Sequence, residues 1–211
     1  MVSRRNMLKT GLTAVFGACA VRTASASEVQ QKSQNNFDVV ILGAGTGGLV
    51  TAIEAADLGL KPVVLEKMEC SAGNSLYASG GIAAWGTSQQ KEEGRNETKE
   101  SFREDMMKVS EYRADPALVG AYVNHIPEDF EWLKKQGVKF SKIGKKPWPL
   151  NYRMHNVDGQ GLTGGARLVR YLLEACEKRN IPIIYNTKAI ELLTNDAGRV
   201  IGVRAQGDLH K

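Results

Sequence analysis

Cysteine is scarce in this sequence, and no two cysteines have the spacing of a metal site or a haem attachment. Cys19, Cys70 and Cys176 are present among 211 residues, and neither a C-x-x-C nor a C-x-x-C-H stretch occurs. The pattern excludes a zinc site of the usual spacing and a c-type haem attachment. No metal ligands are therefore expected, and Cys176, within a predicted helix, is expected to be a buried apolar residue.

An excess of positive charge is also missing from most of the chain. The formal net charge is +5, but residues 1–26 contain four basic residues and no acid, so the remainder is close to neutral. No basic run with interleaved aromatic residues occurs. The sequence therefore gives no indication of nucleic-acid binding.

The apolar run at residues 11–21 is too short to span a bilayer as a helix. It follows Arg4 and Arg5 and precedes the small residues at 24–26, which is the order of a secretory signal peptide. Residues 3–9 resemble the twin-arginine export consensus. We expect a signal peptide at residues 1–26, export to the periplasm and no membrane span after cleavage. A lipoprotein site at Cys19 and a short amphipathic helix are weaker alternatives, and residues 27–36 read as a polar linker.

A dinucleotide-binding pattern begins at residue 37. Residues 37–42 form a short apolar run that predicts a buried parallel strand, and residues 49–58 predict an alanine-rich helix. Between them, Gly43, Gly45 and Gly48 occupy the three positions of G-x-G-x-x-G, which permit the tight turn, the approach of a pyrophosphate and close helix–strand packing. The amides at the start of the helix are expected to hold the phosphates.

A second strand, residues 61–65, ends at Glu66, 23 residues after Gly43. An acid at that place accepts a hydrogen bond from a ribose 2′-hydroxyl and repels a 2′-phosphate. Residues 70–87 are then rich in Gly, Ala and Ser, which suits a backbone lying against a large planar ligand. The alternatives are a glycine loop that only turns the chain and a flexible surface linker.

These stretches resemble the flavoprotein subunits of fumarate reductase and succinate dehydrogenase, most of all the soluble periplasmic flavocytochrome c fumarate reductases. The carriers are DVVILGAGTGGLVTAIEAADLGLKPVVLEK, GNSLYASGGIAAW, DPALVGAYV, the RMH…TGG stretch at 153–165 and RNIPIIYNTKAIELL. The resemblance implies an α/β, Rossmann-like FAD-binding fold with a glutathione-reductase-type parallel sheet and a β-meander, occupying residues 37–211 and truncated before the capping domain.

The resemblance also implies where FAD is contacted. It places the pyrophosphate at Gly43, Gly45, Gly47 and Gly48, and the ribose at Glu66 and Lys67. It places the flavin along Asn74, Ser75, Gly80 and Gly81, and the adenine at the backbone of Ala189. Asn74 stands where membrane-bound members carry the histidine that attaches FAD, so non-covalent FAD is expected. The haem domain of the flavocytochromes is not recognised, so electrons are expected from a separate cytochrome c-type protein or another donor.

The rest of the chain contributes weaker predictions. A largely solvent-facing helix is expected at 91–111, a helix started by Asp115 at 117–125, and a further turn or helix to residue 137 with Trp132 in the core. Residues 141–165 read either as a plain loop or as a loop whose Arg153 and His155 approach the flavin or an anionic substrate. An amphipathic helix at 166–179, a third parallel strand at 181–185 and a hairpin at 189–205 complete the pattern.

The resemblance implies reduction of the C=C bond of fumarate or a related unsaturated carboxylate. Because the family's catalytic residues fall outside the matched stretches, no catalytic residue is assigned, and the chain is expected to be inactive alone. Two alternatives stay open. One is the binding module of a split flavoprotein completed by another chain; the other is a related FAD-dependent oxidoreductase acting on another enoate, such as methacrylate or urocanate, or on a 3-ketosteroid.

Overall fold

The computed structural model describes residues 36–148, 152–159 and 163–207. The predicted signal peptide and nearly all of the predicted linker lie outside these residues. Within the described ranges, no helix is both long and apolar enough to cross a membrane.

A three-stranded parallel sheet carries the first half of the predicted pattern. Strand β1 (Val39–Leu42) pairs with β2 (Pro62–Leu65), which pairs with β5 (Ile183–Ile184), in the order β1-β2-β5. Helix α1 (Thr46–Asp57) connects β1 to β2, as expected for a right-handed crossover between parallel strands. The α/β fold class predicted from the sequence is confirmed.

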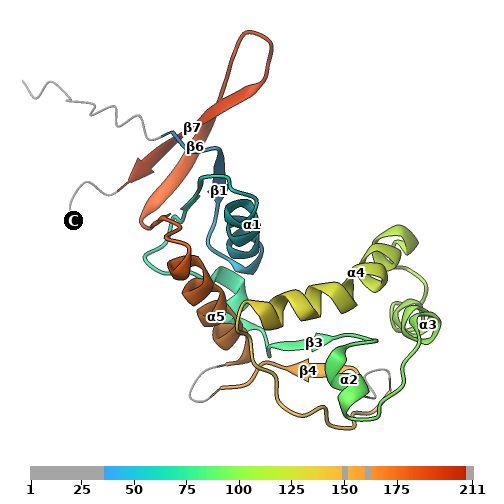
Figure 1. Cartoon of the computed structure of the whole chain (residues 1–211). Helices are drawn as coiled ribbons and strands as arrows, with labels where there is room; N and C mark the ends of the chain where they lie inside the picture. The colour runs from blue at the N-terminus through green and yellow to red at the C-terminus, as the bar shows by residue number, and fades with distance from the viewer. Residues whose placement is uncertain (1–35, 149–151, 160–162, 208–211) are drawn as a thin grey trace, which may run out of the picture. The chain divides into compact units, whose positions relative to one another are not determined.

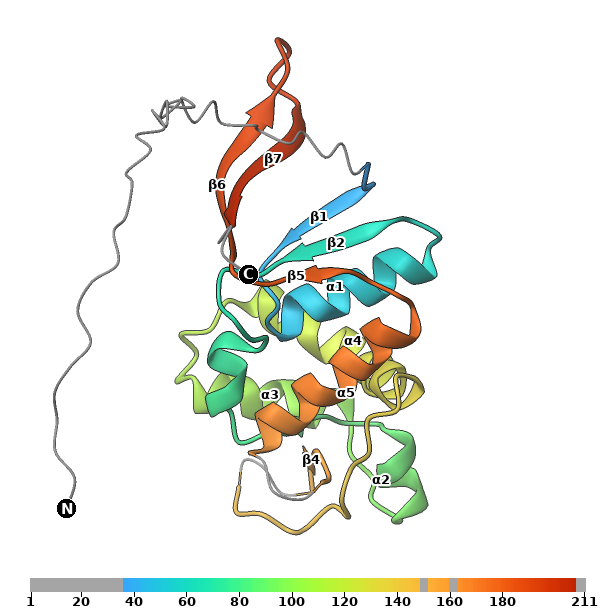
Figure 2. The same ribbon diagram turned by 90° about the vertical axis from the view of Figure 1, so that its left-hand side faces the viewer.

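Helix α5 (Gly164–Lys178) packs beside α1 against the same sheet (Figures 1 and 2). Its apolar face is regular, with Val169, Leu172 and Cys176 all buried. The helix starts two residues before the predicted position because Thr163 caps it, accepting a hydrogen bond from the backbone N–H of Ala166 at 3.3 Å. The burial predicted for Cys176 is confirmed. The shared core contains Ile41, Ala44, Leu49, Ala52, Ile53, Val64, Ala72, Val169, Leu172, Ala175, Cys176 and Ile181.

The predicted helix at 91–111 is wrong in one respect, because the structure divides this segment into two helices. Helix α2 (Ser88–Glu92) ends before Gly94, which adopts a positive φ of 68°, and α3 (Lys99–Val109) starts anew after Thr98. Each helix has its own threonine cap: Thr87 forms a capping box with Gln90, and Thr98 accepts from the N–H of Ser101.

The two elements predicted between residues 117 and 137 are instead one helix, α4 (Pro116–Lys135). Asp115 caps it as predicted, accepting from the N–H of Ala117 at 2.7 Å. Pro127 lies inside the helix, where proline removes one backbone hydrogen bond. The helix continues because its buried face runs past the proline, from Val123 and Ile126 to Phe130.

The segment predicted as a loop at 141–165 contains a short strand. Strand β4 (Met154–Asn156) pairs antiparallel with β3 (Gly81–Ala83), which follows the 3₁₀ turn η1 (Gly73–Tyr77). His155 lies opposite Ile82 in this pair. The sequence did not predict β4, because its partner strand β3 lies more than 70 residues earlier in the chain and neighbouring residues carry no sign of the pairing.

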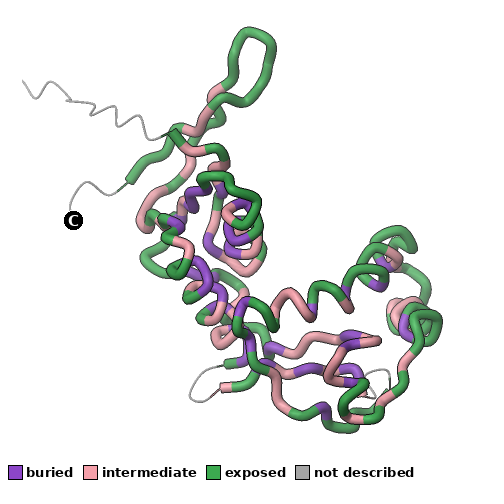
Figure 3. Tube along the Cα trace, viewed as in Figure 1, coloured by how far each residue is buried: buried purple, intermediate pink, exposed green. Residues whose placement is uncertain are grey.

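The predicted hairpin is confirmed as β6 (Thr187–Thr194) and β7 (Val200–Gly207). Asn195 shapes its turn by accepting hydrogen bonds from the N–H groups of Ala197 and Arg199, and Gly198 takes a positive φ of 73°. Much of the hairpin is exposed (Figure 3). Its exposed large apolar side chains are Ile190, Leu192, Val200 and Ile201.

Candidate functional site

The turn between β1 and α1 requires two of its glycines for its own geometry. Gly43 has a φ of 102° and donates its N–H to the carbonyl of Leu65 at 2.8 Å, which joins the turn to the end of β2. A Cβ on Gly48 would overlap the carbonyl oxygen of Gly43. By contrast, a Cβ on Gly47 would meet nothing within 4 Å. Space is therefore left in front of the first turn of α1.

Helix α1 begins without a side-chain cap. Its N-cap is Gly45, and its first turn contains no acidic residue. The first N–H groups of a helix lack intrahelical partners and, with the helix dipole, attract anions. Thr46 is the exception here, because its N–H lies 3.4 Å and its hydroxyl 2.9 Å from the hydroxyl oxygen of Ser75. Ser75 is thereby held at the start of α1.

Glu66 lies directly beside this turn. One of its carboxylate oxygens accepts the N–H of Ala44 at 2.7 Å and the other accepts the N–H of Met68 at 2.9 Å, and the residue is 7% exposed. Each carboxylate oxygen has two acceptor positions, so each retains one after these bonds. The carboxylate is thus fixed in place and can still accept a hydroxyl donor.

The loop after Glu66 lies against the glycine turn. Ala72 donates its N–H to the carbonyl of Ala44 at 2.9 Å and adopts a φ of 109°, a conformation strained for a residue with a Cβ. Its carbonyl in turn accepts the N–H of Ser75 at 2.9 Å. The hydroxyls of Ser71 and Tyr185 are 2.8 Å apart, which ties the loop to the end of β5.

The residues at the start of β6 are hydrogen-bonded to the segment that contains Glu66. The N–H of Thr187 donates to the carbonyl of Glu66 at 2.9 Å, and the N–H of Asn186 donates to the carbonyl of Met68 at 3.0 Å. Ala189 follows two residues later, at a register shift in the β6–β7 pair. Lys67, between the two anchored carbonyls, is exposed. The structure therefore groups the residues predicted for the pyrophosphate and ribose with Ser75 and the beginning of the strand that carries Ala189.

Gly80 and Gly81 have packing requirements of their own. Gly80 has a φ of 77°, and a Cβ there would overlap the backbone of Gly164 at the start of α5. A Cβ on Gly81 would overlap the sulfur of Met154 across the β3–β4 pair. Asn74 is exposed within η1. The predicted position of these three residues along a flavin stays a prediction, because close packing already explains both glycines.

Sequence reasoning missed Thr46, Ala44 and the glycine pair at 164–165. Thr46 occupies an unspecified position of the glycine motif, and Ala44 acts only through its backbone. The pair Gly164–Gly165 follows a threonine cap, a signal that could have placed the start of α5 correctly. A Cβ on Gly165 would overlap the carbonyl oxygen of Ser75, so this pair brings α5 against η1.

Arg153 belongs to a buried charge cluster and does not lie in a plain loop. Its guanidinium bonds both oxygens of Glu97 at 2.8 and 2.9 Å and one oxygen of Asp105 at 2.7 Å, with Ser101 at 3.1 Å. Burial alone would raise the pKa of Asp105, but hydrogen bonds from Trp148 and Arg153 outweigh it and lower that pKa. The contacts bind the strand β4 region to α3, which gives Arg153 a structural role.

His155 is fully buried and paired at both ring nitrogens. Nδ1 lies 2.7 Å from the carbonyl of Arg153, and Nε2 lies 2.9 Å from the hydroxyl of Thr87. A carbonyl only accepts, so Nδ1 carries the proton and Nε2 accepts from Thr87. Burial lowers the pKa of His155 despite these bonds, and the ring of Phe130 lies 4.5 Å away. His155 is therefore a neutral core residue, whereas His125 is exposed on α4.

The arrangement fits an adenine dinucleotide with a free ribose 2′-hydroxyl. The space before Gly47 and the uncapped start of α1 suit a diphosphate, and the fixed Glu66 carboxylate suits a sugar diol. These features occur at the carboxyl ends of parallel strands, where open α/β sheets bind their ligands. Within the described residues, no group of three or more His, Cys, Asp or Glu is placed to hold a metal ion.

Comparison with known proteins supports the same assignment. The family model described as FAD binding domain matches residues 38–209. A fumarate reductase (cytochrome) from Shewanella frigidimarina is 35% identical over 173 residues, which cover 82% of this chain and 30% of that protein.

Two solved structures are also similar. A 3-ketosteroid-Δ4-(5α)-dehydrogenase from Rhodococcus jostii RHA1 superposes with a TM-score of 0.73 at 27% identity, over 83% of this chain and 44% of that one. The open conformation of a flavocytochrome c3 fumarate reductase gives 0.70 at 28% identity, over 81% and 30%. This chain thus spans less than half of the length of each of these three proteins.

Proposed function

Because the chain belongs to the FAD binding domain family, we propose that it is the FAD-binding portion of a fumarate reductase-type flavoprotein. The observation that carries the proposal is the meeting of the uncapped start of α1 with the Glu66 carboxylate, joined by the hydrogen bond from Ala44. One element offers amides to the diphosphate and the other offers an acceptor to the ribose.

The proposed FAD is held without a covalent bond. The position at which the sequence resemblance places an attaching histidine is Asn74 here, and a side-chain amide nitrogen is a poor nucleophile. Bound FAD supplies hydride transfer to the C=C bond of an unsaturated carboxylate. The chain's own groups then bind and orient the cofactor.

We further propose that the described residues bind FAD without turning over fumarate by themselves. The sequence leaves Arg153 and His155 either in a plain loop or in a loop that approaches the flavin or an anionic substrate. Arg153 is committed to Glu97 and Asp105, and His155 is buried and neutral between Thr87 and a backbone carbonyl. Neither is placed to deliver a proton to a substrate.

The test is to purify the full chain, add excess FAD, remove free flavin and measure bound flavin and viologen-dependent reduction. Fumarate, methacrylate, urocanate and a 3-ketosteroid form the substrate panel. We expect yellow protein with a raised melting temperature and no turnover of any substrate. Absence of bound flavin would contradict the binding proposal, whereas robust turnover would contradict only the proposal of inactivity and would identify the substrate.

Residues 1–26 direct export to the periplasm by the twin-arginine route in this proposal, and a separate c-type cytochrome or another protein donates electrons. The support is the order of Arg4–Arg5, the apolar run and the small residues at 24–26. Fractionation of cells expressing the chain and its double variant Arg4→Lys, Arg5→Lys tests the route. The variant is expected to remain in the cytoplasm; equal export of both would contradict twin-arginine transport.

A second candidate is a split flavoprotein completed by another chain. The β6–β7 hairpin favours it, because four large apolar side chains there are 51–65% exposed. Within the described residues, β1 also pairs along one edge only. Large exposed apolar side chains and an unpaired strand edge are features that interaction sites use. Co-purification from the native cell would show a stoichiometric partner that carries the remaining flavoprotein sequence; recovery of the chain alone would contradict this candidate.

A further inference from the structure

One residue of the loop beside the glycine turn has a backbone conformation that alanine rarely adopts. Ala72 has a φ of 109° and a ψ of −33°. The other non-glycine residues with positive φ in the described ranges have values of 51–56°, within the left-handed helical region that L-residues can occupy; they are Glu111, Tyr112, Asn180 and Asn186. A φ of 109° lies outside that region, so the folded chain stores strain at Ala72.

Three contacts hold Ala72 in this conformation. Its N–H donates to the carbonyl of Ala44 at 2.9 Å, and its carbonyl accepts the N–H of Ser75 at 2.9 Å. The residue is 1% exposed and belongs to the core that α1 and α5 share. The strain is therefore offset by two hydrogen bonds and by burial.

The strained residue determines where Ser75 lies. The turn η1 starts directly after Ala72, and the hydroxyl oxygen of Ser75 accepts the hydroxyl of Thr46 at 2.9 Å at the start of α1. A Cβ on Gly45 would lie 3.8 Å from the carbonyl oxygen of Ala72, so the loop passes close to the N-cap of α1. Rotation of Ala72 to a negative φ would redirect this carbonyl and release Ser75 from α1.

We propose that Ala72 is a positioning residue of the FAD site, and that its strain lets residues 70–75 open locally while the rest of the chain stays folded. The strain favours the open arrangement, whereas a bound cofactor favours the closed one, in which Ser75 lies at the start of α1. Bound FAD and the strain at Ala72 thus act in opposite directions on one loop. The inference rests on the proposed FAD-binding function and adds a conformational step to it.

Native-state hydrogen exchange of the full chain, followed amide by amide with NMR, tests the local opening. Without flavin, the amides of Ala72 and Ser75 should exchange at least about tenfold faster than that of Val64, after correction for intrinsic rates. Val64 is a suitable reference because it is fully buried and its N–H donates to the carbonyl of Pro182 at 3.0 Å. Saturating FAD should slow both loop amides by at least about tenfold, because the cofactor binds the closed loop.

The variant Ala72→Gly relieves the strain and keeps both backbone hydrogen bonds. In the flavin-free chain it should slow exchange of the Ser75 amide by about fivefold, the lower end of the effect expected from the strain. It should also bind FAD at least as tightly as the parent chain. If the methyl group of Ala72 served only the core, its removal would instead speed the exchange and weaken FAD binding.

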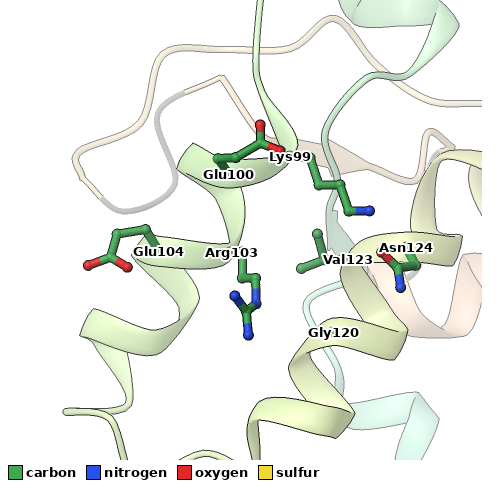
Figure 4. A pocket seen from close by; sticks show the side chains of 7 residues that line it. All are labelled: Lys99, Glu100, Arg103, Glu104, Gly120, Val123 and Asn124. Atoms are coloured by element: carbon green, nitrogen blue, oxygen red, sulfur yellow. The ribbon is translucent and has the colours of Figure 1, made fainter.

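Two substitutions in the α3–α4 region control for general changes in stability. Glu111→Gly relieves a positive φ at an exposed site just after α3. Gly120→Ala adds a methyl group to α4 at the cavity between α3 and α4 (Figure 4), where it meets nothing within 4 Å, and it should stabilise the helix. Each should change the exchange of the Ser75 amide by less than about twofold, because distant sites act independently.

The outcomes separate this proposal from the function on which it rests. It is overturned if the two loop amides exchange as slowly as that of Val64, if Ala72→Gly fails to slow Ser75 or weakens FAD binding, or if a control variant slows Ser75 equally. Absence of any FAD effect in every chain would contradict the proposed function. The flavin-free exchange rates decide the local opening independently of that result.

Discussion

The carboxylate of Glu66 accepts the backbone N–H of Ala44 at 2.7 Å, so the acid that ends β2 is bonded directly into the glycine turn that follows β1. The residue is also held by the N–H of Met68 and buried to 7% exposure. The bond makes the two halves of the nucleotide pattern one structural unit. A substitution at Glu66 should therefore change both the stability of the chain and its affinity for FAD, and the two changes can be measured separately.

Replacing Glu66 by Gln should lower both stability and FAD retention. The glutamine amide can accept only one of the two backbone N–H groups, so a buried hydrogen bond to a charged group is lost, at a cost of about 1.5–3 kcal/mol. Urea unfolding without flavin measures this cost, and FAD titration measures the lost ribose acceptor. Glu69→Gln, an exposed acid three residues later, is the matched control; equal effects of the two variants would refute the assigned role.

Gly47 and Gly48 should respond oppositely to alanine. A Cβ on Gly48 overlaps the carbonyl oxygen of Gly43, so Gly48→Ala should unfold the turn or destabilise the chain strongly. Gly47→Ala meets open space and should raise apo stability by up to about 1 kcal/mol through helix propensity. If the diphosphate occupies that space, Gly47→Ala should also reduce FAD affinity. Thermal melts with and without FAD check both effects. An unchanged affinity for FAD would show that the diphosphate does not occupy the space in front of Gly47.

The parts predictable from sequence are those specified by neighbouring residues. The glycine turn with its flanking strand and helix, the Asp115 cap and the Asn195 turn each follow from a few consecutive positions. The continuity of α4 through Pro127 and the burial of Arg153 depend instead on distant contacts. Arg153 pairs with Asp105 across 48 positions of sequence, and no local pattern announces such a pair. The sequence alone therefore leaves contact with a ligand open for Arg153, whereas its partners in the structure are carboxylates of the same chain.

Breaking the Arg153 cluster should be costly. Arg153→Met leaves Glu97 and Asp105 without their buried partner, and the loss of one member of such a pair costs about 3–5 kcal/mol. Chemical denaturation at pH 7 measures the loss. Arg204→Met, which breaks an ion pair that is at least half exposed, should cause little change. Comparable losses in both variants would contradict the structural importance of the buried cluster.

The same cluster predicts an acid response. The pKa of Asp105 is lowered in the folded chain from its ordinary value of 3.8. Below that value the unfolded chain binds more protons, so the stabilisation is complete above about pH 4 and is lost as the pH falls through the folded-state pKa. Arg153→Met should lose part of this acid sensitivity. An unchanged slope of stability against pH between pH 5 and 2 would argue against the pairing.

His155 should make stability depend on pH in a higher range. Its pKa is lowered from 6.5 in the folded chain, mainly by burial, so the unfolded chain takes up the proton first. Stability is therefore complete above about pH 6.5 and declines as the pH falls toward the folded-state pKa. Urea midpoints between pH 7.5 and 5 should show this decline, and His155→Asn should flatten it. His125→Asn, at an exposed site on α4, should leave the decline unchanged. A flattened profile in that control would show that the decline does not come from His155.

Cys70 and Cys176 should differ widely in reactivity. Cys70 is exposed, whereas Cys176 is buried between α5 and α1, and burial raises the pKa of its thiol to about 11. Because the thiolate is the nucleophile, brief treatment of the folded chain with iodoacetamide at pH 8 should alkylate Cys70 and spare Cys176. Urea should make the two react alike, because unfolding removes the burial that separates them. Peptide mass mapping gives each extent separately, and rapid labelling of Cys176 without denaturant would show that α5 does not pack on α1 as described.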